Sequence, residues 1–445
     1  MQHDFRPLQD MFRWQRAASL DGGDTWTVQV LDTQSPFFGY LINTSRTYWR
    51  EETELRFGTD TDAAAAYLAD NRFRIDGEGL TAGQVAEHKR NLLNKIFCIG
   101  YMLHRFKSPS RAWAPYAMDG KLGEDGECNG RSGKSFFFKA LSIFLNTVTL
   151  SGRNPRLMDN PHVFDQVTRH TDMLQVDDCN RYLRPSLFFD NITSDMNVNP
   201  KNQQSYTIPF EESPKLAFST NYVPSEFDPS TDARLLYMVF SDWYHQRTSD
   251  NDYRESRSIR DDFGRDLYAQ TYPEELWNAD LNFFLQCTRF YLDVSRTGEK
   301  LLPPMDGILL RKYKADMGKH FENWADVYFS PESGRLDTLV VRQEAYLDFK
   351  IQSGLKDLTT NSFSKMISAY AALSPHIHAL NPKFMLNSTG RLIRKDSLGK
   401  TVEMIYLETE EAWRARNAQD EPKQAPAAHS EPVLFTPDPD ELPMP

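Results

Sequence analysis

The stretch "GECNGRSGKSFF", residues 126–137, decides how the rest of this sequence is interpreted. Its second half matches a phosphate-binding loop, written G-x-x-x-x-G-K-[ST], through Gly133, Lys134 and Ser135. The position of the first glycine holds Cys128 instead. A helix that begins at Lys134 would turn backbone N–H groups toward a bound anion. Taken alone the tripeptide is a weak signal, because short matches arise by chance.

In a loop of this kind the lysine and the hydroxyl residue have separate tasks. Lys134 would reach the β- and γ-phosphates of ATP, and the Ser135 hydroxyl would ligate Mg²⁺. A non-glycine residue is tolerated at position 128 where its φ is negative, and Gly126 and Gly130 can provide the turn. We therefore expect ATP and Mg²⁺ at a loop formed by Asn129, Gly130, Ser132, Gly133, Lys134 and Ser135.

Two acids end an apolar run further along the chain, in "MLQVDD", residues 173–178. We predict a buried strand here, with Asp177 and Asp178 at its end. One carboxylate would hold Mg²⁺, directly or through water, and its neighbour would polarise the attacking water, because hydrolysis needs both tasks. The alternative is that the two acids are ordinary turn residues that end the strand. The phosphate-loop motif makes this alternative the weaker one.

Two more polar residues lie next to apolar runs. Asn221 ends "KLAFSTN" and would hydrogen-bond the γ-phosphate or the water, although Asn is also an ordinary turn residue. Arg234 precedes "LLYMVF" and would reach the γ-phosphate of a neighbouring subunit, although it would also serve as a surface arginine. The candidate catalytic residues are thus Asp177, Asp178, Asn221 and Arg234, and the candidate metal ligands are Ser135 and Asp177.

The composition is that of an ordinary globular protein, with 445 residues of which 40% are hydrophobic and 25% charged. The sequence has no run of ~18 apolar residues, so we predict no membrane span. The N-terminus has no secretory pattern. The four cysteines are scattered without a C-x-x-C pair, which argues against a zinc site or a disulfide framework. We expect a protein of the reducing cytoplasm, without a membrane partner.

The net charge of −11 argues against a strongly basic nucleic-acid binder. The charge is uneven, however, because residues 417–445 contain six acids and one base and so carry −5. A local basic loop would still bind DNA, above all where several copies line one channel.

Strand-like and helix-like runs alternate through residues 84–300, which predicts an α/β fold with a mostly parallel sheet covered by helices. One helix is expected from about residue 84, a second at Lys134 and a third over 265–295. The run "SYTIPFEESPKLAF", residues 205–218, predicts a hairpin arm that leads into a buried strand.

Residues 1–83 combine strand-like runs, "TWTVQVLD" at 25–32 and "FFGYLINTSRTYW" at 37–49, with a helix in "DAAAAYLADN" at 62–71. We expect Asp62 to cap this helix. Asp60 and Asp62 as a metal-binding pair is the less favoured alternative, because no matching His or further carboxylate motif is evident.

Residues 338–407 predict a separate small unit with two helices, at 340–354 and 361–373, followed by a hairpin, which is a winged-helix pattern. The hairpin would contact a DNA backbone, or would equally dock a protein. From residue 417 the chain is Pro-rich and acidic, and we expect it to be disordered, with a partner-binding peptide as the alternative. The basic residues on the hairpin are Arg391, Arg394, Lys395 and Lys400.

The order of these motifs resembles the superfamily 3 helicases of viruses, phages and plasmids, and most of all the phage and poxvirus-type primase-helicases. The resemblance covers about residues 85–410, because "FSDWYH" and "DDFGRDL" also look like that group. The order of the four motifs is specific, whereas each motif alone is not.

The resemblance implies an AAA+ P-loop ATPase that forms a homo-oligomeric ring, usually a hexamer, with ATP between subunits. Asn221 would be the sensor and Arg234 the finger that acts in trans. The stretch 191–210 corresponds to a DNA-tracking hairpin, and Lys201 is its only basic residue. Lys201 is therefore the candidate for a phosphate contact in the pore, with a solvated loop lysine as the alternative.

The implied domains are an N-terminal α/β accessory region at 1–83, the ATPase at 84–300, a winged helix at 301–416 and the tail at 417–445. The implied function is an ATP-dependent helicase of phage or mobile-element replication in a bacterial host cytoplasm, acting on single-stranded or forked DNA. No primase catalytic set is evident in the first 80 residues, so either a separate primase or polymerase would prime, or this chain is only the helicase part.

Two other functions stay open. One is an AAA+ replication initiator or remodeller that binds DNA without processive unwinding. The other is a ring that binds nucleotide but hydrolyses it poorly, against which the full set of catalytic candidates counts. Cys128 and Cys179 each lie beside a motif and would allow a redox switch, but inert thiols are the favoured interpretation.

Overall fold

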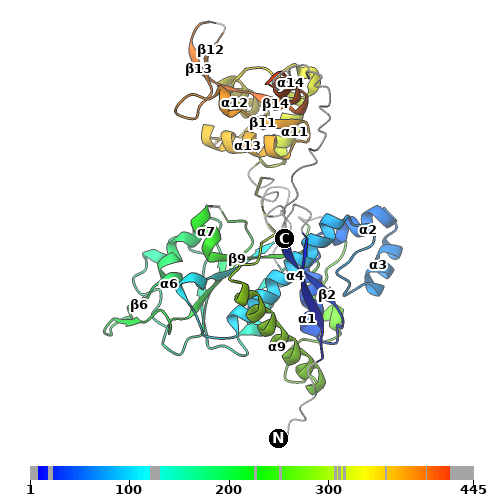
Figure 1. The fold of residues 1–445 in the computed structure, drawn as a ribbon, viewed down its shortest axis with the longest axis vertical. Helices are drawn as coiled ribbons and strands as arrows, with labels where there is room; N and C mark the ends of the chain where they lie inside the picture. The colour runs from blue at the N-terminus through cyan, green and yellow to red at the C-terminus, as the bar shows by residue number, and fades with distance from the viewer. Residues whose placement is uncertain are drawn as a thin grey trace, which may run out of the picture. The chain divides into compact units, whose positions relative to one another are not determined.

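The computed structural model describes residues 9–18, 24–120, 131–224, 228–249, 253–304, 308, 312–313, 317–355, 358–396 and 398–420. The chain divides into two compact units, residues 1–320 and 321–445 (Figure 1). In the described part of the chain, no helix is both long enough and apolar enough to cross a membrane.

The first unit is built on a five-stranded sheet in the order β4-β5-β8-β3-β9. All four pairs of neighbouring strands are parallel, which confirms the predicted α/β class. The carboxyl ends of parallel strands open at one edge of a sheet, where ligands bind in folds of this class. The strands are β3 (Ala114–Asp119), β4 (Thr147–Ser151), β5 (Met173–Cys179), β8 (Lys215–Thr220) and β9 (Leu235–Phe240).

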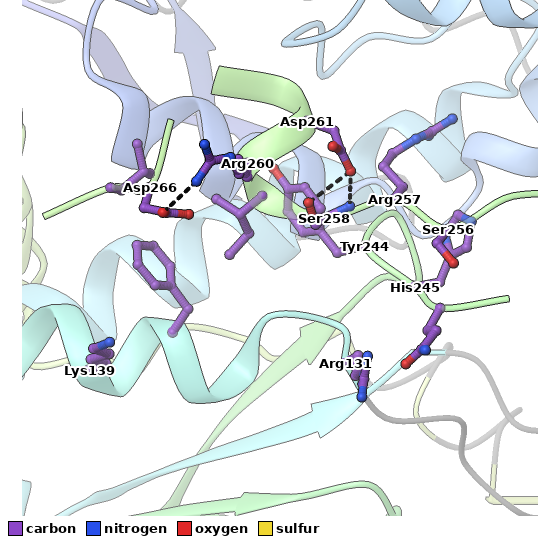
Figure 2. Close-up of a pocket in the computed structure, with 14 residues that line it drawn as sticks. Arg131, Lys139, Tyr244, His245, Ser256, Arg257, Ser258, Arg260, Asp261 and Asp266 are labelled. Carbon is purple, nitrogen blue, oxygen red and sulfur yellow. Dashed lines mark hydrogen bonds and ion pairs between the residues drawn. The ribbon is translucent and has the colours of Figure 1, made fainter. Parts of the chain in front are cut away.

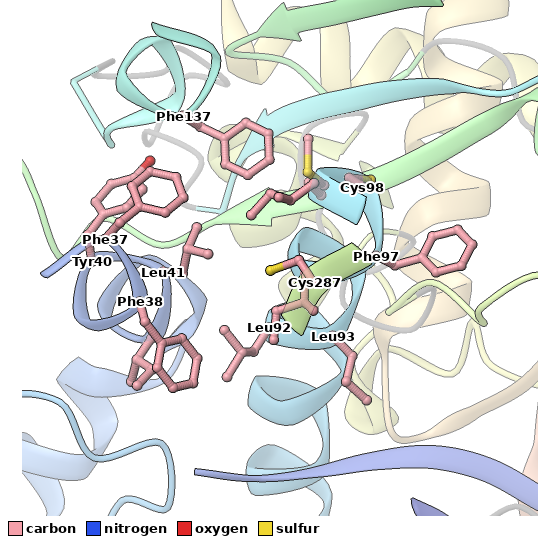
Figure 3. Close-up of a cluster of buried hydrophobic side chains, with 14 of the residues drawn as sticks. Phe37, Phe38, Tyr40, Leu41, Leu92, Leu93, Phe97, Cys98, Phe137 and Cys287 are labelled. Atoms are coloured by element: carbon pink, nitrogen blue, oxygen red, sulfur yellow. The ribbon is translucent and has the colours of Figure 1, made fainter. Parts of the chain in front are cut away.

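Helices cover the sheet. Their apolar residues recur at helical spacing, which gives each helix an apolar face that packs into the core. The helix expected from residue 84 and the one expected over 265–295 are both present, as α4 (Ala82–Met102) and α9 (Glu274–Thr297). The helix expected at Lys134 is α5 (Lys134–Leu141). Figure 3 shows the core between them, where Phe137 of α5, Leu92 of α4 and Cys287 of α9 are all buried.

The prediction of a strand over residues 37–49 is wrong, because this stretch begins with helix α1 (Pro36–Ser45). Ser35 caps the helix by accepting a hydrogen bond from the Phe38 N–H, and Pro36 fits the first helical position. All ten residues of α1 are buried, and a helix that is apolar on every side belongs in a core. Tertiary burial therefore outweighs the strand preference of its aromatic residues.

The cap predicted for the helix in residues 62–71 is also wrong, by two positions. The helix is α3 (Thr61–Asp70), and its cap is Asp60, whose carboxylate accepts from the Ala63 N–H at 3.1 Å. Asp62 lies in the first turn, where a negative charge is favourable at a helix N-terminus. No group of three or more metal-ligating side chains occurs in the described ranges, which leaves the D-x-D pair without the further ligands it would need.

The remaining elements of the first unit surround this core. The predicted arm around residue 207 is confirmed as the antiparallel hairpin β6–β7. These elements are β1 (Phe12–Ala18), β2 (Asp24–Val30), α2 (Trp49–Phe57), α6 (Phe189–Thr193), β6 (Met196–Val198), β7 (Tyr206–Ile208), α7 (Pro229–Arg234) and α8 (Ile259–Phe263).

The second unit has its own aromatic core, where Phe321 contacts Phe349 and Phe363 at ring distances of 4.9 and 5.6 Å. Its helices are α11 (Lys319–Tyr328), α12 (Arg342–Ser353), α13 (Thr360–Leu373) and α14 (Glu410–Asp420). Its strands are β10 (Val340–Val341), β11 (Ile377–Leu380), β12 (Ile393–Lys395), β13 (Thr401–Ile405) and β14 (Leu407–Thr409).

The two helices and the hairpin predicted for this unit are present as α12, α13 and the antiparallel pair β12–β13. Strand β10 joins the other side of β13, which gives the order β10-β13-β12. The predicted domain boundaries at residues 83, 300 and 416 stay predictions. The tail is predicted from residue 417, but residues 417–420 belong to α14, and the part from residue 421 onward lies outside the described residues.

Candidate functional site

The phosphate-loop motif lies between the end of β3 and the start of α5. Gly133 is the N-cap of α5 with φ +97°, a left-handed conformation that suits glycine and explains the need for it here. Lys134 is buried, and its ammonium contacts the carboxylate of Asp119, the last residue of β3. Ser135 follows it on α5 and is exposed to solvent.

Helix α1 supports this loop from the core side. The Tyr40 hydroxyl donates to the Gly133 carbonyl oxygen at 2.9 Å. A Cβ added at Gly133 would lie 3.0 Å from the Tyr40 ring, so the loop and α1 are in close contact. The α1 helix, predicted as part of an accessory region, thus contacts the glycine turn of the candidate phosphate loop.

The two predicted acids lie at the end of β5, where the strand departs from regular pairing. The register with β8 shifts between Val176 and Cys179, and Asp178 has φ +53°. Such shifts re-aim side chains and are frequent beside active sites. The Asp178 carboxylate accepts from the Arg153 Nε at 2.7 Å, and both side chains are partly exposed.

Ser219 of β8 links the acids to the middle of the sheet. Its hydroxyl donates to the Asp177 carboxylate and accepts from the Asp178 N–H at 3.1 Å. Ser219 pairs in register with Ala117 of β3, two residues before Asp119. Adjacent strands lie about 4.8 Å apart, so β5 and β3 are about 10 Å apart. The sheet thus brings the acids, Ser219 and the phosphate loop together at one edge.

Asn221 comes directly after β8 at this same edge, half-buried. Arg234 does not, because it precedes β9, whose first residue pairs with the first residue of β3. A strand of six residues spans about 20 Å, which separates Arg234 from its own phosphate loop. Its guanidinium lies over the Phe189 ring at 4.9 Å and donates to Ser230.

The candidate DNA contacts come from both units. Lys201 is exposed in the turn of the β6–β7 hairpin, with Asn202 beside it in a left-handed conformation. In the second unit the basic residues of the β12–β13 hairpin and of the loop before it are exposed, which are Arg391, Arg394, Lys395 and Lys400. Both hairpins therefore present charge to solvent, as a phosphate backbone requires.

A cavity of about 700 Å³ adjoins the phosphate loop. Figure 2 shows it between α5, with Lys139, and the segment around α8, with Arg260 and Asp261. Arg131 lies at the phosphate-loop end, while Phe136, Ile259 and Leu267 give the cavity apolar walls. Positively charged and apolar side chains thus lie together on its walls.

The cysteine switch gains no support from the geometry of Cys179. Its side chain is buried, and burial raises the pKa of the Cys179 thiol to about 12, so the reactive thiolate does not form near neutral pH. Cys128, Asn129 and Gly130 lie outside the described residues.

Two residues of the site escaped sequence reasoning, Asp119 and Tyr40. Asp119 ends the apolar run "APYAMD", which is the same pattern that pointed to Asp177. Tyr40 carried no signal, because its role depends on the packing of α1 against the loop.

Comparisons with known proteins leave the family of this chain undetermined. No protein-family model matches it, and no curated protein does. A solved structure described as the A form apo structure of NrS-1 C terminal region is similar at 12% identity, covering 72% of this chain and 74% of that one, with a TM-score of 0.32. A second structure of that region has 12% identity, covers 70% of each chain and has a TM-score of 0.31. At these values the likeness carries no conclusion about fold or activity.

Proposed function

We propose that this chain is a magnesium-dependent ATPase of the AAA+ type that drives DNA unwinding in phage or mobile-element replication. One observation carries the proposal. The parallel sheet gathers Lys134 and Ser135, the Asp177–Asp178 pair and Asn221 at the carboxyl edge of three adjacent strands. These are the groups that cleavage of a terminal phosphate needs.

The residues at this edge divide the work of hydrolysis. Ser135 and Asp177 would hold Mg²⁺ through their oxygen atoms, and the bound metal would neutralise charge on the phosphates. Ser219 and Gln175 orient the Asp177 carboxylate by donating to it. Asp178 polarises the attacking water, and Asn221 fixes the position of that water or of the γ-phosphate. The cavity beside Arg131 takes the rest of the nucleotide.

The position of Arg234 supports an assembly of several copies. A guanidinium at the opposite end of β9 serves a phosphate only in a neighbouring subunit. A ring of this kind, with six subunits as the expected number, would also gather one Lys201 from each copy around the DNA. This reconciles DNA binding with a net charge of −11.

The second unit supports contact with duplex DNA. Its order of α11, β10, α12, α13, β11 and a basic hairpin supports the proposal of a winged helix. In this proposal the β12–β13 hairpin lies along the phosphate backbone at a fork or origin.

The test is ATP hydrolysis and strand separation by the full chain on a forked duplex. We expect DNA-stimulated hydrolysis and unwinding, both reduced at least 100-fold in Lys134→Ala, because the variant has no ammonium to bind the phosphates. Lys89→Ala is the control and should match the wild type, because this partly buried lysine of α4 pairs with Asp76 and is not a member of the candidate site. Hydrolysis that survives Lys134→Ala would refute the proposal.

The same assay separates the proposal from the initiator or remodeller. A basic hairpin on a winged helix also suits a protein that binds an origin without unwinding it. DNA-dependent hydrolysis without strand separation would favour that second function.

A further inference from the structure

Lys134 and Asp119 form a buried ion pair beneath the phosphate loop. The Lys134 ammonium contacts Asp119 Oδ1 and also donates to Ser132 Oγ at 3.1 Å, while Ser132 donates to the same Asp119 oxygen. The lysine and aspartate side chains are 8% and 6% exposed. The three groups therefore form a closed cluster between β3 and α5.

Lys134 is the cation that pairs with the Asp119 carboxylate. Its second oxygen, Oδ2, is buried and makes no hydrogen bond within the described ranges. Removing one member of a buried ion pair is costly, because the remaining charge is left uncompensated. Ser132 supplies one neutral donor, which is not a replacement for the ammonium.

A phosphate that enters the loop needs the same ammonium. If Lys134 turned fully to the phosphate, Asp119 would lose its cation. If Lys134 stayed between Asp119 and the phosphate, its N–H donors would be shared between the two groups. The Asp119 charge would also repel the phosphate, because water screens charges poorly in the protein interior. Both arrangements lower the affinity for nucleotide.

We propose that Asp119 is a positioning residue that competes with nucleotide phosphates for Lys134. It keeps the loop charge-compensated when no nucleotide is bound, and it weakens binding of the nucleoside diphosphate left after hydrolysis. The inference rests on the proposed function, because it takes Lys134 as the phosphate-binding lysine.

The test replaces Asp119 by Asn, which keeps the size of the side chain and an acceptor oxygen for Ser132. MgADP and a slowly hydrolysed ATP analogue with Mg²⁺ are titrated into the full-length wild type and Asp119→Asn by calorimetry. We expect the Kd of both nucleotides to fall at least tenfold in the variant, and a fluorescent ADP analogue to dissociate correspondingly more slowly. An unchanged or weaker affinity would overturn the role of Asp119.

A matched control removes the same charge elsewhere in the sheet. Asp172 lies just before β5, at the opposite edge, where it pairs with Arg105. Asp172→Asn should leave the Kd of MgADP unchanged. Equal tightening in both variants would show a general charge effect and refute a specific competition for Lys134.

A second variant keeps the test decisive if Asp119→Asn does not fold. Asp119→Ser removes the charge with a smaller hydroxyl side chain and should tighten MgADP binding in the same direction. A merely structural aspartate would give weaker binding in both variants. No nucleotide binding by the wild type would count against the proposed function itself, whereas wild-type binding without tightening overturns only the competition.

Discussion

His88 shows at the scale of a single residue how burial fixes a protonation state. Its ring is fully buried on α4, where Nε2 accepts from the Tyr48 N–H at 3.0 Å and Nδ1 lies 3.2 Å from the Ile75 carbonyl oxygen. Nδ1 therefore carries the proton of the neutral ring. Burial, with smaller contributions from Arg46 and Lys95, lowers the pKa of His88 to about 3.

This shift predicts a loss of stability in mild acid. Between pH 6.5 and 3 the unfolded chain binds a proton at His88 that the folded chain does not, so stability falls as pH falls. The free energy of unfolding should drop by about 2 kcal/mol from pH 6.5 to pH 5 through this residue alone. Urea unfolding of wild type and His88→Gln at several pH values measures it.

Comparing the wild type with His88→Gln separates the effect of His88 on stability from that of the other titrating groups. Burial also lowers the pKa of His104 to about 4, but His104 is present in both proteins and its effect cancels in the difference. The variant should therefore have the shallower dependence on pH. Equal slopes would contradict the assignment of a neutral, buried His88.

At the scale of elements, the sequence predicted best where a motif coincided with a strong period. The strand with Asp177 and Asp178 and the helix that begins at Lys134 are where the motifs predict them. A strand is predicted where α1 lies, because its aromatic and β-branched residues favour a strand when considered alone. The structure has a helix there instead. Only the packing of Phe37 and Tyr40 against α5 and α9 shows why a helix forms there (Figure 3).

The β6–β7 hairpin gives a prediction at the same scale. Lys201→Ala should weaken binding to a single-stranded oligonucleotide at least fivefold. The dependence of log Kd on log salt should also become shallower by roughly 0.7 for each phosphate that a lysine no longer neutralises. Fluorescence anisotropy over a range of salt concentrations measures both quantities.

Gln203 supplies the control, because it is exposed on the same turn but uncharged. Gln203→Ala should bind DNA as the wild type does. If Lys201→Ala kept wild-type affinity and salt dependence, Lys201 would be a solvated loop lysine and the pore contact would be refuted.

At the scale of the whole molecule, Arg234 predicts that the active site is shared between copies. Arg234→Ala and Lys134→Ala should each be inactive alone. An equal mixture should recover about one quarter of the wild-type ATPase activity, because one interface in four combines an intact lysine with an intact finger. Steady-state hydrolysis of reassembled mixtures is the measurement.

Arg169 provides a matched control on the surface of the same unit, where it pairs with Glu212. On its own, Arg169→Ala should hydrolyse ATP at the wild-type rate. Mixing it with Arg234→Ala or Lys134→Ala subunits should not raise the rate above that value. Failure of the Arg234→Ala and Lys134→Ala mixture to recover any activity would argue against an interfacial site.

The sequence by itself determined the candidate residues of the site: a lysine after a glycine turn, and polar residues at the ends of apolar strands. These follow from local rules, since short motifs and strand periods are written in neighbouring residues. The tertiary structure decided which distant residues meet. The pairing of Asp119 with Lys134, the contact of Tyr40 with Gly133 and the Ser219–Asp177 hydrogen bond join separate elements. Strand order and helix packing set such contacts, and neither is encoded in a local pattern.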